Sequence, residues 1–220
     1  THFQPMEEFT VEQFADGLGA AFEYVRAVRR HDSEMTHASV NMNFLRSAGS
    51  SLVHPHMQTL VDDTGTNEQR LLVEASRRYR DQHGSTYWRD LIDEERGGER
   101  WIGETDGVEW LAPFAPKHHR HVLGILTEET VPDPDDDTVT GLAEGLTNVL
   151  ASYAEAGLNA FNFALHLPDD DAMPPVLNVI SRSVFDEYYW SDSPFFTVLH
   201  DEGVVETAPE QYGADVRSRF

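Results

Sequence analysis

The order of helix-like and strand-like segments constrains the fold of this chain more than any other feature. Residues 9–30 place apolar side chains at helical spacing behind Thr10, a residue type that commonly caps helices. Two short β-rich runs follow at 38–44 and 52–60, and the charged segment 67–82 is again helical in pattern. The first part of the chain therefore predicts a helix, two strands and a second helix.

The pattern restarts after the charged, glycine-containing stretch at 95–100, which is typical of a linker. The expected strands are 101–103, 107–111, 121–126, 161–166, 176–180 and 195–199, and the expected helices are 138–156 and 209–219. This order predicts an α+β fold of antiparallel sheets with packed helices. It also suggests two similar units, at 1–96 and 97–220, the first of which is expected to lack its N-terminal strands.

The charge of the chain narrows the possible partners. Its 220 residues include 39 acidic and 16 basic side chains, a formal charge of −23, and Lys117 is the only lysine. Sequence-independent binding of DNA or RNA needs Lys and Arg side chains that neutralise the phosphates, so this composition rules against a nucleic-acid partner. An anionic membrane would repel the same acidic surface. The acidic residues are spread along the chain and do not form one patch. This favours the hypothesis that they solvate the protein in the high-salt cytoplasm of a halophile over the hypothesis that they bind a basic partner.

Cysteine and long apolar runs are both missing from the sequence. Without cysteine, the chain can form neither disulfides nor thiolate metal sites. No apolar run approaches the length of a membrane span, and no signal peptide is visible. We therefore expect a cytoplasmic protein with no membrane partner.

The segment from His54 to Gln58, with the sequence HPHMQ, is the strongest candidate for a site. Polar side chains at i, i+2 and i+4 share one face of an extended strand, and Pro55 restricts that strand to an edge or a bulge. The turn at Gly49, Ser50 and Ser51 could present N–H and hydroxyl donors to an anion. A neutral imidazole can attack phosphorus while such donors stabilise the developing charge. A solvated edge strand with two incidental histidines remains the alternative.

The remaining histidines give weaker signals. The cluster from Lys117 to His121, with the sequence KHHRH, is interpreted as a polar surface loop in preference to a metal or phosphate contact. His166 ends an apolar strand but has no companion in an H-x-H arrangement.

The segment 40–58, VNMNFLRSAGSSLVHPHMQ, closely resembles the active-site segment of the galactose-1-phosphate uridylyltransferases, a branch of the histidine-triad superfamily. The matching positions are Asn43, Gly49, Ser51, His54, Pro55, His56 and Gln58. A weaker resemblance extends over nearly the whole chain, through 109–116, 161–166 and 195–217. The resemblance implies that both parts of the chain are histidine-triad-like units.

The resemblance also implies a ping-pong transfer of a uridylyl group from UDP-glucose to galactose 1-phosphate. His56 would be the covalent nucleophile, Gln58 would bind a non-bridging phosphate oxygen, and Asn43 would hold the diphosphate together with Gly49 and Ser51. The family forms dimers whose C-terminal arm reaches the neighbouring subunit's site. Phe196 and Val198 match that arm, so a homodimer is expected.

The sequence also departs from the family pattern. His54 would join a residue matching His2 in a zinc site, but the usual cysteine pair is absent, so the shell would be incomplete. The second metal site of the family uses an H-x-H run where this chain has Asn178 and Ile180, and no second metal is expected. The lysine of the arm is also missing. Three alternatives therefore stay open: another hexose 1-phosphate, adenylyl transfer, or an inactive nucleotide-binding protein of the same fold.

Overall fold

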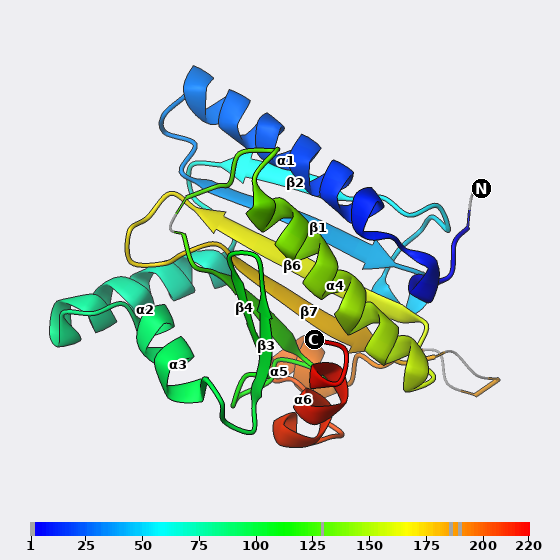
Figure 1. The fold of residues 1–220 in the computed structure, drawn as a ribbon. Helices are drawn as coiled ribbons and strands as arrows, with labels where there is room; N and C mark the ends of the chain where they lie inside the picture. The colour runs from blue at the N-terminus through cyan, green and yellow to red at the C-terminus, as the bar shows by residue number, and fades with distance from the viewer. Residues whose placement is uncertain (1–2, 129, 185–186, 189–190) are drawn as a thin grey trace.

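The computed structural model describes residues 3–128, 130–184, 187–188 and 191–220 (Figure 1). The helices are α1 (Val11–His31), α2 (Asn67–His83), α3 (Tyr87–Glu95), α4 (Asp137–Glu155), α5 (Phe195–His200) and α6 (Pro209–Arg217). The strands are β1 (His37–Phe44), β2 (Gln58–Asp62), β3 (Trp101–Thr105), β4 (Val108–Leu111), β5 (Val122–Leu126), β6 (Ala160–Pro168) and β7 (Val176–Arg182). None of the helices in the described ranges is long and apolar enough to cross a membrane.

The seven strands form one sheet in the order β2-β1-β6-β7-β5-β4-β3, and every neighbouring pair is antiparallel. The predicted α+β class with antiparallel strands is therefore confirmed. The expected boundary between 96 and 97 falls in the loop between α3 and β3, but strands from both sides of it join the same sheet. Division of the chain into two similar units stays a prediction.

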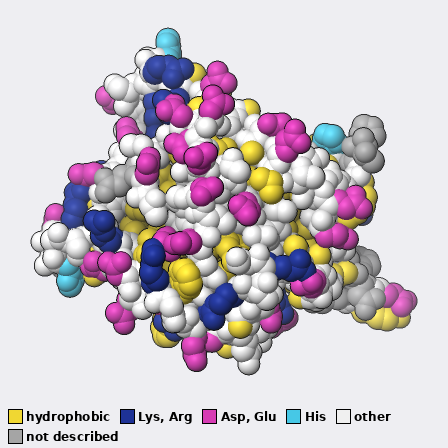
Figure 2. Space-filling view, viewed as in Figure 1, with side chains coloured by type: hydrophobic (Ala, Val, Ile, Leu, Met, Phe, Trp, Pro, Cys, Tyr) yellow, Lys and Arg dark blue, Asp and Glu magenta, His cyan; other side chains and the backbone are white. Residues whose placement is uncertain are grey.

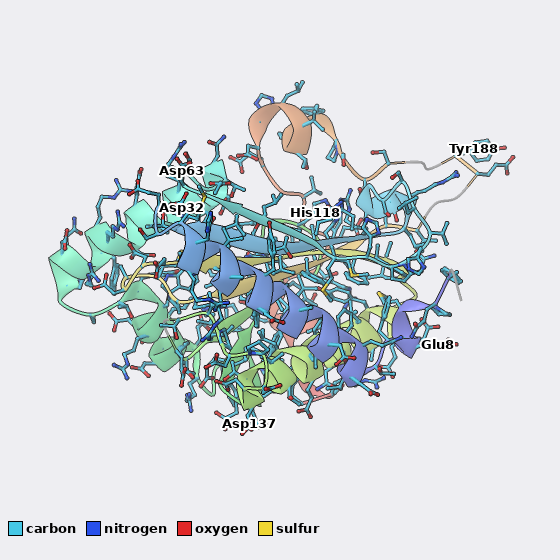
Figure 3. The ribbon with its side chains drawn as sticks, turned by 90° about the horizontal axis from the view of Figure 1, so that it is seen from above. Glu8, Asp32, Asp63, His118, Asp137 and Tyr188 are labelled. Atoms are coloured by element: carbon cyan, nitrogen blue, oxygen red, sulfur yellow. The ribbon has the colours of Figure 1, made fainter. Side chains whose placement is uncertain are left out.

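The two faces of the sheet are covered differently. Figure 1 shows α1 and α4 crossing one face, and Figure 3 shows α5 projecting from the other. Alternate residues of β1 follow this division, because Val40, Met42 and Phe44 are buried in the core while Asn41 and Asn43 point to the opposite side. On that opposite side, α2 and α3 pack over β4 and β5 through a second, smaller apolar cluster.

The sequence signals at the start of α1 are confirmed in detail. The hydroxyl of Thr10 accepts a hydrogen bond from the Gln13 N–H, and the Gln13 side chain accepts one from the Thr10 N–H. This reciprocal capping satisfies two backbone donors that the helix cannot satisfy itself. Behind the cap, Phe9 packs edge-on against Phe44 with ring centroids 5.3 Å apart, which ties the start of α1 to β1.

Three elements differ from the expectations. Residues 52–57 form a loop and β2 begins only at Gln58, because Pro55 has no N–H to offer a ladder. The expected strand at 195–199 is instead the short helix α5, which Asp201 ends in a left-handed conformation. The helix α3 was not expected, although Thr86 caps it as sequence rules would suggest.

Small residues let α4 approach the sheet closely at Trp110. The indole N–H of Trp110 donates to the Thr105 hydroxyl at 2.8 Å, and this hydroxyl donates to the Gly141 carbonyl at 2.7 Å. A Cβ added to Gly145 would overlap the indole ring of Trp110, which is fully buried. Glycine is therefore required at 145 for packing.

Replacing Gly145 with alanine should destabilise the protein. Alanine favours a helix by about 1 kcal/mol over glycine, but forcing a methyl group into a filled core costs about 1–3 kcal/mol, and the buried ring has no room to move. Urea unfolding should show a net loss of stability, whereas Glu144→Ala on the exposed side of α4 should change it little. A gain in stability for Gly145→Ala would contradict the close packing of α4 on Trp110.

Candidate functional site

Polar side chains form a row on the sheet face that points away from α1 and α4. Gln58 of β2 lies opposite Asn41 of β1, and Asn43 lies opposite Asn162 of β6. Paired residues of antiparallel strands point to the same face, so all four belong to one surface, which Asn178 of β7 extends. Since neighbouring strands are about 4.8 Å apart, this polar face spans about 14 Å from β2 to β7.

The two histidines of the HPH segment lie in the loop that leads into β2. The prediction that they share one face of a strand is therefore wrong, although β2 is an edge strand as expected. Because the strands are antiparallel, the residues that precede Gln58 lie toward the end of β1 that holds Asn43. His54 is exposed and His56 is half-buried.

The His56 ring is held in one orientation by its own loop. Its Nδ1 lies 3.0 Å from the carbonyl oxygen of His54. A carbonyl can only accept, so Nδ1 of the neutral ring carries the proton and Nε2 keeps its lone pair. Pro55 restricts the backbone between the two residues. The loop thus presents an imidazole whose Nε2 is the nitrogen that has the lone pair in this tautomer.

A cleft of about 340 Å³ borders this loop and falls within the size range of small-molecule sites. It is lined by Gln4, Phe9, Gln13, Phe14, Gly17, Met42, His54, Pro55, His56 and Met57. A second cleft, of about 490 Å³, lies between α3, the end of α2 and β5, and none of the sequence-predicted site residues lines it. The first cleft lies on the α1 side of the histidine loop, because Phe14, Gly17 and Met42 line it. His54 and His56 are the only sequence-predicted site residues in its lining. Asn43, Ser51 and Gln58 are not part of it.

The small-residue turn before the histidines is strained and satisfies most of its own donors. Leu45 and Gly49 both have positive φ, at 66° and 84°. The Gly49 N–H donates to the Arg46 carbonyl, and the Ser50 N–H donates to the Leu45 carbonyl at 3.0 Å. The Ser50 hydroxyl is buried and donates to the Leu52 carbonyl. Of the three predicted anion-binding residues, exposed Ser51 keeps both its N–H and its hydroxyl free of hydrogen bonds to the described residues.

The three histidines of the KHHRH cluster are buried, although Lys117 is exposed and Arg120 is half-buried, so the interpretation as a polar surface loop is wrong for the histidines. His118, His119 and His121 are at most 9% exposed, and Figure 3 labels His118 on the α5 side of the sheet. The segment that follows α5 covers the cluster, since a Cβ on Gly203 would overlap the Lys117 carbonyl. That segment lies more than 80 residues away in the sequence, so local pattern could not reveal the burial.

Burial strongly lowers the pKa values of three histidines, two of them in this cluster. Desolvation lowers the pKa of His121 to about 3, and the positive charge of Lys117 adds to the effect. Its Nδ1 accepts the Lys117 backbone N–H at 3.2 Å, which fixes the neutral ring with Nε2–H directed at the Asn178 oxygen. Burial likewise lowers the pKa values of His118 and His166 to about 4.

The expected metal ligands do not form a metal site in the described part of the chain. His2 lies outside the described residues, and no group of three or more His, Cys, Asp or Glu side chains within them could hold a metal ion. Asn178, which occupies part of the H-x-H position, is paired with His121. Zinc therefore stays a prediction.

The two residues expected in the arm lie on α5. Phe196 and Val198 are 49% and 66% exposed, and Figure 3 shows α5 projecting from the polar-face side of the sheet. Acidic side chains are scattered over the face shown in Figure 2 and do not gather into one patch. The exposed apolar helix is therefore a feature distinct from the charged surface around it.

Comparison with known proteins supports the fold. No family model matches the sequence. An uncharacterized protein of Archaeoglobus fulgidus is 36% identical over 218 residues, which cover 98% of this chain but 65% of the relative. A solved uridylyltransferase structure matches all of this chain and 71% of its own, with a TM-score of 0.84 and 18% identity. The ADP-glucose phosphorylase of Arabidopsis thaliana matches 99% of this chain and 70% of its own, with a TM-score of 0.79 and 17% identity. The expected resemblance is confirmed at the level of the fold.

The buried histidines predict how stability depends on pH. The pKa values of His118, His121 and His166 lie below the usual 6.5, so between about pH 4 and 6.5 the unfolded chain binds more protons than the folded one. Stability should therefore fall as the pH falls through this window, by up to about 1.4 kcal/mol per pH unit for each histidine.

Urea unfolding at several pH values should test this dependence. The double variant His118→Asn/His166→Asn should show a shallower fall than the wild type, whereas His31→Asn, at the exposed end of α1, should keep the wild-type slope. Equal slopes for the double variant and the wild type would show that these imidazoles are not kept neutral by the fold.

Proposed function

We propose that the protein is a nucleotidylyltransferase in which His56 carries the nucleotidyl group covalently. The observation that supports this most directly is the contact between His56 Nδ1 and the His54 carbonyl, which favours the tautomer that has its lone pair on Nε2. The adjoining cleft, the polar face and the shared fold with a uridylyltransferase are consistent with it. The chain spans 65% of its sequence relative, so this activity is proposed for the protein of which these residues form the histidine-bearing part.

In the first half-reaction, Nε2 of His56 attacks the α-phosphorus of a nucleoside diphosphate sugar. An N–P bond forms as the bond from this phosphorus to the bridging oxygen breaks, and the sugar 1-phosphate leaves with the electron pair. The imidazole becomes positively charged when it is substituted, and the hydrogen bond from Nδ1–H to the His54 carbonyl stabilises that charge. The carbonyl therefore stabilises the intermediate more than the free enzyme.

In the second half-reaction, a phosphate oxygen of the acceptor sugar 1-phosphate attacks the same phosphorus. A new P–O bond forms, the N–P bond breaks, and His56 recovers its lone pair. Gln58, Asn43 and Ser51 would donate hydrogen bonds to the non-bridging oxygens, on which negative charge accumulates. Phe196 and Val198 would reach the site of a second subunit, which makes a homodimer the expected assembly.

The proposed substrates are UDP-glucose as donor and galactose 1-phosphate as acceptor. One observation favours a second candidate, because a solved structure of the same fold is an ADP-glucose phosphorylase with bound ADP-glucose. Adenylyl transfer from ADP-glucose is therefore the alternative. The same covalent step would apply, since only the base of the donor differs.

Incubation with UDP-glucose labelled at the α-phosphorus should transfer label to the protein. The phosphoramidate is labile in acid, so the reaction is stopped without acid and the labelled residue is identified by mass spectrometry. His56→Asn should lower labelling by about 10³-fold or more, as loss of a covalent nucleophile does. His31→Asn, which removes an exposed histidine away from the cleft, is the matched control and should label normally.

Parallel incubations distinguish the alternatives. Label from ADP-glucose but not UDP-glucose would establish adenylyl transfer, and the acceptor is identified by which sugar 1-phosphate removes the label. If neither donor labels the wild-type protein although both bind, the chain is a nucleotide-binding protein and the proposed transferase activity is wrong.

A further inference from the structure

A chain of hydrogen bonds connects β7 to the substrate-binding turn through β6. It begins at Arg182 and passes through Asn162 to Asn43, the asparagine expected to bind the diphosphate. Asn162 and Arg182 were not singled out from the sequence. They belong to β6 and β7, more than 100 residues after Asn43, so only the fold brings them together.

Arg182 determines the donor-to-acceptor direction of these hydrogen bonds, because a guanidinium has donors and no acceptor. Its Nε donates to Asp192 at 2.8 Å, its Nη2 contacts the other oxygen of the same carboxylate, and its Nη1 donates to the Asn162 oxygen at 2.9 Å. The Asp192 side chain is 1% exposed and that of Arg182 is 14% exposed. Because Nη1 can only donate, the Asn162 atom that faces β7 is its oxygen.

The orientation of Asn162 then determines that of Asn43. With its oxygen directed at Arg182, Asn162 directs its NH₂ group the other way, where it donates to the Asn43 side-chain oxygen at 2.6 Å and to the Ala48 carbonyl at 2.8 Å. Both hydrogens of that amide are used. Asn43 must therefore accept through Oδ1, and its own NH₂ group makes no hydrogen bond to a described residue.

Asn41, on the same strand, uses its side-chain amide in the opposite way. Asn41 donates through Nδ2 to the Ser39 hydroxyl at 3.0 Å and to the Gln58 carbonyl at 3.4 Å, which leaves its oxygen unpaired among the described residues. Position on β1 therefore does not by itself direct an amide NH₂ outward. The orientation of Asn43 depends on its partners across the sheet.

We infer that Asn162 and Arg182 are positioning residues that hold the Asn43 NH₂ group toward the phosphate of a bound nucleotide. If the Asn43 amide were reversed, it would present an oxygen lone pair to an anionic oxygen and repel it. Asn162 also holds the Ala48 carbonyl, which keeps the turn before Ser51 in register with Asn43. This inference rests on the proposed function, since it assigns a role to the same site.

The first test removes the donor from Asn162. In Asn162→Asp, the carboxylate still accepts from Arg182 but can no longer donate to Asn43 or to the Ala48 carbonyl. The dissociation constant of UDP-glucose, measured by calorimetry, should rise about 10- to 100-fold, the effect of losing one or two hydrogen bonds to a charged group. Asn148→Asp on α4 adds the same charge on the other side of the sheet and should leave binding unchanged.

A double-mutant cycle separates positioning from a general structural effect. If Asn162 acts through Asn43, then Asn162→Ala should weaken UDP-glucose binding in the wild-type background and have much less effect in the Asn43→Ala background. Equal effects in the two backgrounds would overturn the inference. Arg182→Gln can still donate one hydrogen bond to Asn162, so it should lose less affinity than Arg182→Leu.

A direct readout distinguishes failure of this inference from failure of the proposed transferase. The probe is UMP, and the observable is the Asn43 side-chain NH₂ signal in a ¹⁵N correlation spectrum. The signal should shift on addition of UMP in the wild type and not in Asn162→Asp. If UMP shifts the signal in the wild type but not in Asn162→Asp, and the wild type takes no label from UDP-glucose or ADP-glucose, then the transferase proposal fails and the positioning role stands. An unmoved signal in the wild type, or normal labelling and affinity in Asn162→Asp, would overturn the positioning role.

Discussion

The pairing of β1 with β6 is the contact on which the rest of this structure depends. The two strands pair from His37 with Pro168 to Phe44 with Phe161, without a bulge. On one face this register stacks Phe44 on Phe161, with centroids 5.2 Å apart, inside the core. On the other face it places Asn43 opposite Asn162. Because a slip of one residue would exchange the two faces, burial of the aromatic pair also determines the arrangement of the polar face.

Structural features that depend on residues close together in the sequence could be predicted, and features that depend on contacts between distant segments could not. The α1 cap at Thr10 and the nucleophile candidate His56 follow from short patterns, and most strands follow from alternation. The burial of His118 could not be predicted, because the covering segment follows α5. Nor could the role of Asn162, whose partners are contributed by β1 and β7. Local rules also failed at residues 195–199, where β-forming side chains adopt a short exposed helix that is not paired with the sheet.

The acidic composition bears on how an anionic substrate could be held. With 39 acidic and 16 basic residues, cations are scarce, and Lys117 and Arg182 are already paired with Glu68 and Asp192. The polar face itself offers neutral donors, chiefly amides and a hydroxyl, while exposed Arg46 of the neighbouring turn makes no ion pair with a described residue. Salt screens interactions between exposed charges but affects oriented N–H groups at contact distance much less. Such a site suits a protein whose own charge would otherwise repel a diphosphate.

His121 and His56 make opposite hydrogen bonds through Nδ1. His121 is neutral because it is dry and its Nδ1 accepts a backbone N–H, so both of its nitrogens are occupied and it cannot react. His56 has the opposite tautomer: its Nδ1–H faces a carbonyl of its own loop, and Nε2 is left for a substrate. The difference comes from which backbone group meets Nδ1, a donor at His121 and an acceptor at His56. A single backbone hydrogen bond thus distinguishes a structural histidine from a candidate nucleophile in this fold.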